Sequence, residues 1–142
     1  MTQAPGGHIL IGESDRDCRS AFMWCLLSEG YWVEPVSNAF DIAVSLDRAE
    51  LPDLIVVDLA LTGLPVVTLI GRMTESERLR RIPILATGLE TPAFELPERV
   101  AFLKKPCAPS ELIARVQRLG GPNLKSLFRE ETRRATGMFR AV

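Results

Sequence analysis

The chain has 142 residues, which suits one domain with a hydrophobic core and leaves little room for a second. Apolar residues make up 46% and charged residues 25%, the balance of a globular protein, and the net charge of −1 gives no general attraction to nucleic acid or to a membrane surface. No apolar run is long enough to cross a membrane. The start of the chain, MTQAPGGH, lacks the basic and apolar regions of a signal peptide. We therefore expect a cytoplasmic protein.

The cysteines and the histidine do not form a recognisable metal or disulfide pattern. Cys18, Cys25 and Cys107 are scattered, no CxxC pair is present, and His8 is the only histidine. A zinc site or a disulfide framework is therefore not expected, and we interpret the cysteines as reduced thiols. Cys18 and Cys25 are one heptad apart, which predicts one side of a helix.

Strand-like and helix-like segments alternate along the chain. Short apolar segments rich in branched residues predict strands at 8–12, 31–36, 54–58, 82–87 and 100–103. Apolar residues at helical spacing predict helices at 15–29, 38–49, 65–76 and 109–119. Pro35 is typical of an edge strand. The segment 88–100, GLETPAFELPERV, contains two prolines, so we expect only a short or irregular helix there.

Two further predictions concern apolar side chains on these elements. Phe40 and Val44 share the apolar side of the 38–49 helix with Ala43 and Leu46, so we expect that side to face the core. Trp24 and Trp32 are expected to pack in the core or at a helix edge rather than to bind a partner.

This alternation predicts an α/β protein, a doubly wound five-stranded parallel sheet with helices on both faces and right-handed crossovers. In such sheets ligands bind at the carboxyl ends of the strands, near a switch point in the strand order. Asp58 directly follows the apolar run LIVV and therefore falls where this architecture places its chemistry.

An extension follows Gly120-Gly121-Pro122. Residues 123–142 place apolar residues near one face of a helix and arginines on the other. The extension has five basic and two acidic residues, a net +3, so the rest of the chain carries −4. We expect an amphipathic helix, packed either on its own domain or, as we favour, in a homodimer. No nucleic-acid-binding fold is recognised in it, and we expect none of its partners to be nucleic acid.

Polar residues stand at several predicted strand ends. Glu13, Ser14 and Asp15 follow the first strand, and Asp58 ends the third. These ends converge in a parallel sheet, and carboxylates packed together are unfavourable unless a cation lies among them. A hard, oxygen-liganded ion such as Mg²⁺ would satisfy such a cluster.

The fourth and fifth strands end in further functional groups. Thr87 offers a hydroxyl, and Lys105 offers an ammonium that could pair with Asp58. An aspartate, a divalent ion, a lysine and a hydroxyl together form a phosphoryl-acceptor site, in which the carboxylate attacks phosphorus and the cations neutralise the transferring oxygens. On periodicity alone, Asp58 could equally be an ordinary strand-ending residue.

The motifs ILIGESD, PDLIVVDLAL, IPILATG and FLKKP, within residues 8–119, resemble a receiver domain of the two-component response regulator family. The resemblance implies a flavodoxin-like fold and phosphorylation of Asp58 by a histidine kinase or a phosphotransfer protein. It also implies Mg²⁺ held by the acid pocket, Asp58 and the backbone carbonyl of Ala60. Lys105 would contact the phosphoryl group and precede Pro106 in a cis bond. Phe102 occupies the position of an aromatic switch residue, and we expect Phe102 and Thr87 to act as the switch residues.

The sequence departs from the family pattern at several positions. The paired acids align with Glu13 and Ser14, so a serine takes the second metal-binding position; either Asp15 helps or Mg²⁺ is held weakly. Counting from Pro83 puts Gly88 at the family's hydroxyl position, with Thr87 one residue early. The proline usual four residues after the aspartate is Thr62.

Two alternatives compete with a phosphorylated receiver. A degenerate receiver would keep the fold and act as a phosphorylation-independent binding module; Ser14 and Gly88 favour this, whereas Glu13 and Lys105 favour retained chemistry. The stretch VVDLALTG also resembles the nucleophile motif of haloacid-dehalogenase phosphatases, but Ala60 stands where their general acid should be. We therefore expect a phosphoacceptor that is not a conventional enzyme.

Overall fold

The computed structural model describes residues 7–121 and residue 124, in which five strands and four helices alternate. The strands are β1 (His8–Gly12), β2 (Trp32–Val36), β3 (Leu54–Asp58), β4 (Ile84–Gly88) and β5 (Val100–Lys104). The helices are α1 (Arg16–Ser28), α2 (Ala39–Leu46), α3 (Val66–Glu75) and α4 (Pro109–Gly120). These elements confirm the predicted strands and four of the predicted helices, with shifts of a few residues at their ends.

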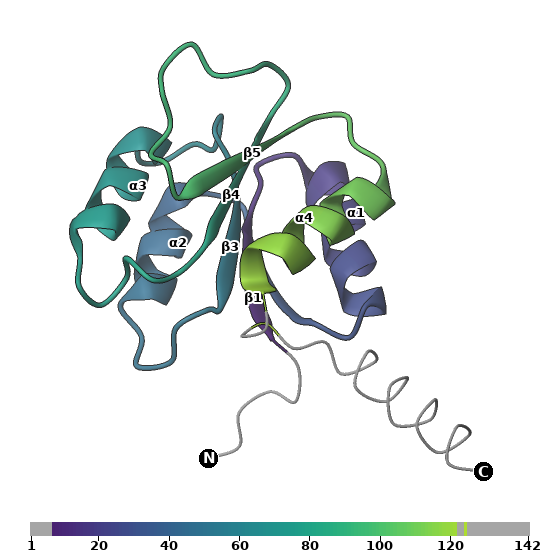
Figure 1. Cartoon of the computed structure of the whole chain (residues 1–142), viewed down its shortest axis with the longest axis horizontal. Coiled ribbons are helices and arrows are strands. Elements are labelled where there is room, and N and C mark those ends of the chain that lie inside the picture. Colours follow the sequence, from purple (N-terminus) through teal and green to yellow (C-terminus); the bar gives the residue numbers. More distant parts are fainter. Residues whose placement is uncertain (1–6, 122–123, 125–142) are drawn as a thin grey trace.

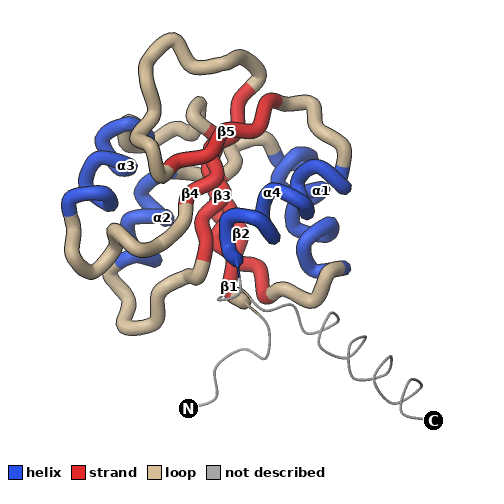
Figure 2. Tube along the Cα trace, in the orientation of Figure 1, coloured by secondary structure: helices blue, strands red, loops and turns tan. Residues whose placement is uncertain are grey.

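All strands are parallel, in the order β2-β1-β3-β4-β5. Helices α1 and α4 cover one face of the sheet, and α2 and α3 cover the other (Figure 1). Figure 2 shows the sheet as a central red layer between the two pairs of blue helices. This is the flavodoxin-like, doubly wound arrangement, and its order reverses between β1 and β3, so the carboxyl ends of these strands form a switch point. Pro35 lies in the edge strand β2, as predicted.

The central strand β3 explains why the sheet needs helices on both faces. All five of its residues are buried. Ile55 and Val57 join the core beneath α2 and α3, whereas Leu54 and Val56 join the core beneath α1 and α4. Because successive side chains of a strand point to opposite faces, Asp58 continues toward the α1/α4 face at the end of this buried run.

Local capping fixes where two of the helices begin. The Asp15 side chain accepts a hydrogen bond from the Cys18 N–H at the start of α1, and the Asn38 side chain accepts one from the Asp41 N–H at the start of α2. Such caps satisfy backbone donors that have no partner within the helix.

The prediction of a short helix between β4 and β5 was wrong. Residues 89–99 form turns and irregular backbone without a helix. Pro92 and Pro97 are five residues apart, and each removes a backbone donor and clashes with the preceding helical turn. The stretch between them is too short for a stable helix.

The predicted packing of four apolar side chains was also wrong. Phe40 and Val44 are more than half exposed, and Ala39, Ile42 and Leu46 form the buried side of α2 instead. Trp24 and Trp32 are likewise mostly exposed. In α2 nearly every residue is apolar, so helical spacing alone did not distinguish the buried stripe from its neighbour.

The extension lies almost wholly outside the described residues, and the prediction of an amphipathic helix or a homodimer there stays a prediction. Its beginning is visible at Leu124, which is buried with the core beneath α1 and α4 and packs directly over Gly120. Within the part of the chain that the structure describes, no helix is long and apolar enough to cross a membrane.

Candidate functional site

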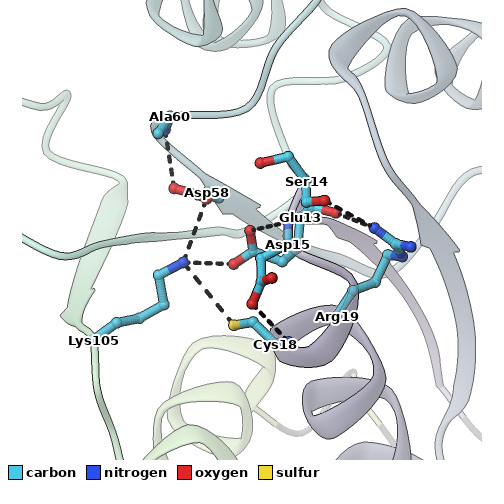
Figure 3. Close-up of polar contacts among 8 residues, drawn as sticks. All are labelled: Glu13, Ser14, Asp15, Cys18, Arg19, Asp58, Ala60 and Lys105. Atoms are coloured by element: carbon cyan, nitrogen blue, oxygen red, sulfur yellow. Dashed lines mark hydrogen bonds and ion pairs between the residues drawn. The ribbon is translucent and has the colours of Figure 1, made fainter.

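Three charged side chains from separate strands meet at the carboxyl edge of the sheet (Figure 3). Glu13 follows β1, Asp58 ends β3, and Lys105 follows β5. Their side chains are only 2%, 7% and 12% exposed, respectively. The sequence brings them together because parallel strands end at one edge, and the structure confirms the predicted proximity of these residues.

The Lys105 ammonium bridges the two carboxylates. Its Nζ lies 2.5 Å from Glu13 Oε1 and 3.3 Å from Asp58 Oδ2. The other Asp58 oxygen, Oδ1, accepts the N–H of Ala60 at 2.9 Å, and Glu13 Oε2 accepts the N–H of Asp15 at 3.2 Å. Both carboxylates are therefore held in place by hydrogen bonds to their own loops, and one cation serves both.

The electrostatics of the pair follow from this shared cation. Burial and the neighbouring Glu13 carboxylate raise the pKa of Asp58, against the opposing effects of the Ala60 N–H and Lys105. Burial also acts to raise the pKa of Glu13, but hydrogen bonds with Asp58, Lys105 and Cys18 bring it below its usual value. The pKa of Lys105 is raised: burial opposes this, and the two carboxylates outweigh it. The site thus has one firmly ionised carboxylate, one ammonium, and an aspartate whose ionisation is disfavoured.

Ser14 and Asp15 have different surroundings from the buried pair. Both are exposed. The Asp15 carboxylate is engaged at the start of α1, where it accepts the Cys18 N–H at 3.1 Å. Arg19 donates to the backbone oxygens of Glu13 and Ser14, at 2.8 and 3.3 Å, and so fixes the loop that presents Ser14. This geometry makes Asp15 a helix cap and leaves Ser14 as the neutral group beside the site.

The register of the sheet separates the two proposed switch residues. Thr87 pairs with Asp58 on β3 and with Leu103 on β5, whereas Phe102 pairs with Ala86. Paired residues of parallel strands point to the same face, so Thr87 and Phe102 point to opposite faces. A side chain added at Gly88 would instead meet the Phe102 ring, at 3.4 Å. Thr87 is therefore beside Asp58 in the sheet, and Gly88 is beside the aromatic ring.

The bond between Lys105 and Pro106 is cis, as the resemblance implied. It lies at the turn from β5 toward α4, and the Lys105 N–H donates to the Gly88 carbonyl at 2.7 Å.

The fit of the site to Mg²⁺ is partial. Glu13 and Asp58 supply the carboxylate oxygens that this ion prefers, and Ser14 and the exposed Ala60 add neutral groups nearby. Among the residues the structure describes, no group of three or more His, Cys, Asp or Glu side chains is arranged to hold a metal. The donor set therefore suits an ion that keeps most of its water ligands.

Sequence reasoning missed two residues that contact this site. Cys18 Sγ lies 4.0 Å from Lys105 Nζ, and Arg19 binds the loop carbonyls described above. Burial and the Glu13 carboxylate raise the pKa of Cys18 to about 12, so its thiol stays protonated at neutral pH. The available signal was spacing: Cys18 is three residues after the Asp15 cap, in the first turn of a helix that begins at this edge.

Solved structures share this fold and this arrangement of strands. The chemotaxis response regulator CheY4 of Vibrio cholerae matches with a TM-score of 0.71 and 20% identity, over 80% of this chain and 98% of that one. A receiver domain of a sensor histidine kinase from Pseudomonas aeruginosa, with a magnesium ion in its active-site cleft, matches with a TM-score of 0.74 and 25% identity, over 82% and 98%.

The chain belongs to the receiver-domain fold of response regulators. The signal receiver domain of a histidine kinase from Syntrophus aciditrophicus matches it further, with a TM-score of 0.68 and 27% identity over 80% of this chain and 89% of that one. This receiver domain also belongs to one family with an uncharacterised 14.6 kDa protein of Leptolyngbya boryana, to which it is 35% identical over 77% of its own length and 86% of the other. No model of a known protein family matches the chain.

Proposed function

We propose that this receiver domain accepts a phosphoryl group on Asp58 and uses the change to switch protein–protein contacts. The observation that supports the proposal is the Lys105 ammonium, which lies between Asp58 and Glu13 at the carboxyl edge of the sheet. Phosphoryl transfer depends on positioning and on neutralisation of charge, and a buried carboxylate beside a fixed ammonium provides both.

In the proposed step, one oxygen of the Asp58 carboxylate attacks phosphorus. The P–O or P–N bond to the donor breaks, and its electron pair leaves with the donor, either an acyl phosphate or a phosphohistidine. The Ala60 N–H steadies Asp58 during the attack, and Lys105 neutralises charge on the transferred oxygens. The pKa of Asp58 is raised, so its carboxylate is not readily ionised. A cation placed beside it favours the ionised, nucleophilic form.

Glu13, Asp58 and the Ala60 carbonyl would hold Mg²⁺, with Ser14 as a neutral neighbour. The ion supplies neutralisation of the phosphoryl oxygens when bound. Because Ser14 contributes no negative charge and Asp15 caps α1, we propose that the ion is weakly held. The donor in the cytoplasm would be a histidine kinase or a phosphotransfer protein, and the domain would act as a switch rather than as a conventional enzyme. A homodimer through residues 123–142 stays a prediction.

A phosphorylation-independent binding module is the second candidate. Gly88 favours it, because a side chain at this position would meet the Phe102 ring, and glycine provides no hydroxyl there. The Lys105 bridge favours phosphorylation instead, because a phosphorylation-independent module does not require an ammonium between the two carboxylates.

Intact-mass measurement after treatment with acetyl phosphate and Mg²⁺ tests the proposal. We expect the mass of one phosphoryl group on the wild type and none on Asp58→Asn. Asp47→Asn, which changes an exposed aspartate at the end of α2, is the matched control and should be modified like the wild type. An unmodified wild type, with Mg²⁺ and donor both in excess, would leave the binding module as the better account.

A further inference from the structure

Cys18 lies beneath the ion pair of Glu13 and Lys105 (Figure 3). The Lys105 ammonium is within reach of its Sγ, at 4.0 Å, and the neighbouring thiol helps to lower the pKa of Glu13. The side chain is half-buried and packs against the core beneath α1 and α4. One small thiol thus lies beside the ion pair, in contact with its ammonium.

The ammonium does not lie midway between the two carboxylates. It is 2.5 Å from Glu13 and 3.3 Å from Asp58, although both carboxylates are almost fully buried. Two of the groups around the cluster act on the Glu13 side: the N–H of Asp15, which donates to Glu13 at 3.2 Å, and the thiol of Cys18. Of these, only Cys18 also contacts the ammonium.

We propose that Cys18 is a positioning residue that holds Lys105 against Glu13. The thiol accepts from the ammonium and donates to the same carboxylate that the ammonium binds, so it closes a three-membered network on the Glu13 side. The consequence for Asp58 rests on the proposed function: with Lys105 drawn toward Glu13, Asp58 Oδ2 is less occupied and more available to an incoming phosphoryl group or cation. The placement of Lys105 itself does not depend on that function.

Competitive acetylation of lysine amines by an acetyl succinimidyl ester measures how firmly Lys105 is held. Tandem mass spectrometry of the full chain after digestion gives the ratio of acetylation at Lys105 to that at Lys104, an exposed neighbour that serves as internal reference. Loss of a weak hydrogen bond in Cys18→Ala should raise this ratio about threefold. Cys18→Ser keeps a donor and an acceptor, so its ratio should return toward that of the wild type.

Cys25→Ala is the matched control, because Cys25 lies on the same helix and contacts the Pro109 carbonyl instead of the site. Its ratio should equal that of the wild type. Equal ratios in the wild type and Cys18→Ala would overturn the proposal, and so would an equal rise in Cys18→Ser and Cys18→Ala, since packing alone would then explain the effect. The labelling decides this point even if the wild type accepts no phosphoryl group, so the two proposals fail separately. Where phosphorylation occurs, Cys18→Ala should slow it about threefold at saturating Mg²⁺.

Discussion

Two clusters of charged side chains in this protein each pair carboxylate with cation, and they differ in charge balance. On the α2 side of the edge strand β2, the carboxylate of Glu34 accepts hydrogen bonds from the Arg48 guanidinium at 2.7 Å and from the Ser45 hydroxyl at 3.2 Å. The Nε2 atom of His8 lies 3.4 Å from the other carboxylate oxygen. At the carboxyl edge, two carboxylates share the one ammonium of Lys105.

The difference separates a structural cluster from a reactive one. Around Glu34 the single carboxylate is matched by the Arg48 guanidinium, and solvent reaches both groups, so its charge is balanced without another ion. Around Lys105 there is more negative charge than one ammonium can neutralise, in surroundings that are almost closed to water. An excess of buried negative charge favours the binding of a cation, which lowers the net negative charge of the cluster.

The largest expected effect comes from removing the shared cation. Lys105→Ala should slow phosphorylation of Asp58 about 100-fold, because a fixed positive charge beside the transferring oxygens is lost. Arg48→Ala removes the corresponding cation of the Glu34 cluster and should leave the rate unchanged. Phosphorylation rates by intact mass, with circular dichroism to confirm folding, make the comparison. A large loss of stability in Lys105→Ala with an unchanged rate would contradict this prediction and make Lys105 a structural residue instead.

A third carboxylate beside Glu13 and Asp58 should increase the affinity of this cluster for a cation. Ser14→Asp places a third carboxylate beside Glu13 and Asp58 and should tighten Mg²⁺ binding about tenfold, through the added attraction for a divalent ion. Titration calorimetry with Mg²⁺ alone measures it, and Ser37→Asp, at an exposed turn after β2, is the control for surface charge. An unchanged Mg²⁺ affinity would show that water already fills the ligand position that we assign to the missing carboxylate at residue 14.

The smallest expected effect concerns stability and its dependence on pH. Because the pKa of Asp58 is raised in the folded protein, the folded state favours its protonated form, and that contribution is lost as the pH rises through the raised value. Asp58→Asn should therefore unfold at a higher temperature than the wild type at pH 7, with little difference below the usual aspartate pKa of 3.8. Glu34→Gln should instead lower the free energy of unfolding by about 0.5–1 kcal/mol at pH 7, as expected when a partly exposed ion pair is weakened. Thermal unfolding at several pH values distinguishes the two variants. An Asp58→Asn variant less stable than the wild type at pH 7 would contradict the prediction that the ionised Asp58 carboxylate destabilises the fold.

Much of the fold was predictable because its signals are local. The apolar run ending in Asp58 indicated a strand, and the predicted helix starts at 15 and 38 fall on the capping residues of α1 and α2. The edge position of Pro35 followed from its missing donor. Predictions failed where the deciding partner was distant. Phe40 and Ile42 are both apolar residues of α2, and only the placement of the helix on the sheet decided which one was buried.

The sequence by itself determined the order of elements, the meeting of Glu13, Asp58 and Lys105 at one edge, and the neutral residue at Ser14. These depend on strand direction and residue type, which the chain carries locally. The tertiary structure alone decided which carboxylate the Lys105 ammonium favours, that Thr87 and Phe102 point to opposite faces, and that Cys18 lies beneath the ion pair. These are matters of a few tenths of an ångström or of one step in register, set by the packing of elements far apart in the sequence. Short-range electrostatics and hydrogen bonding depend on such distances, so the chemistry of the site became visible only once the elements were packed.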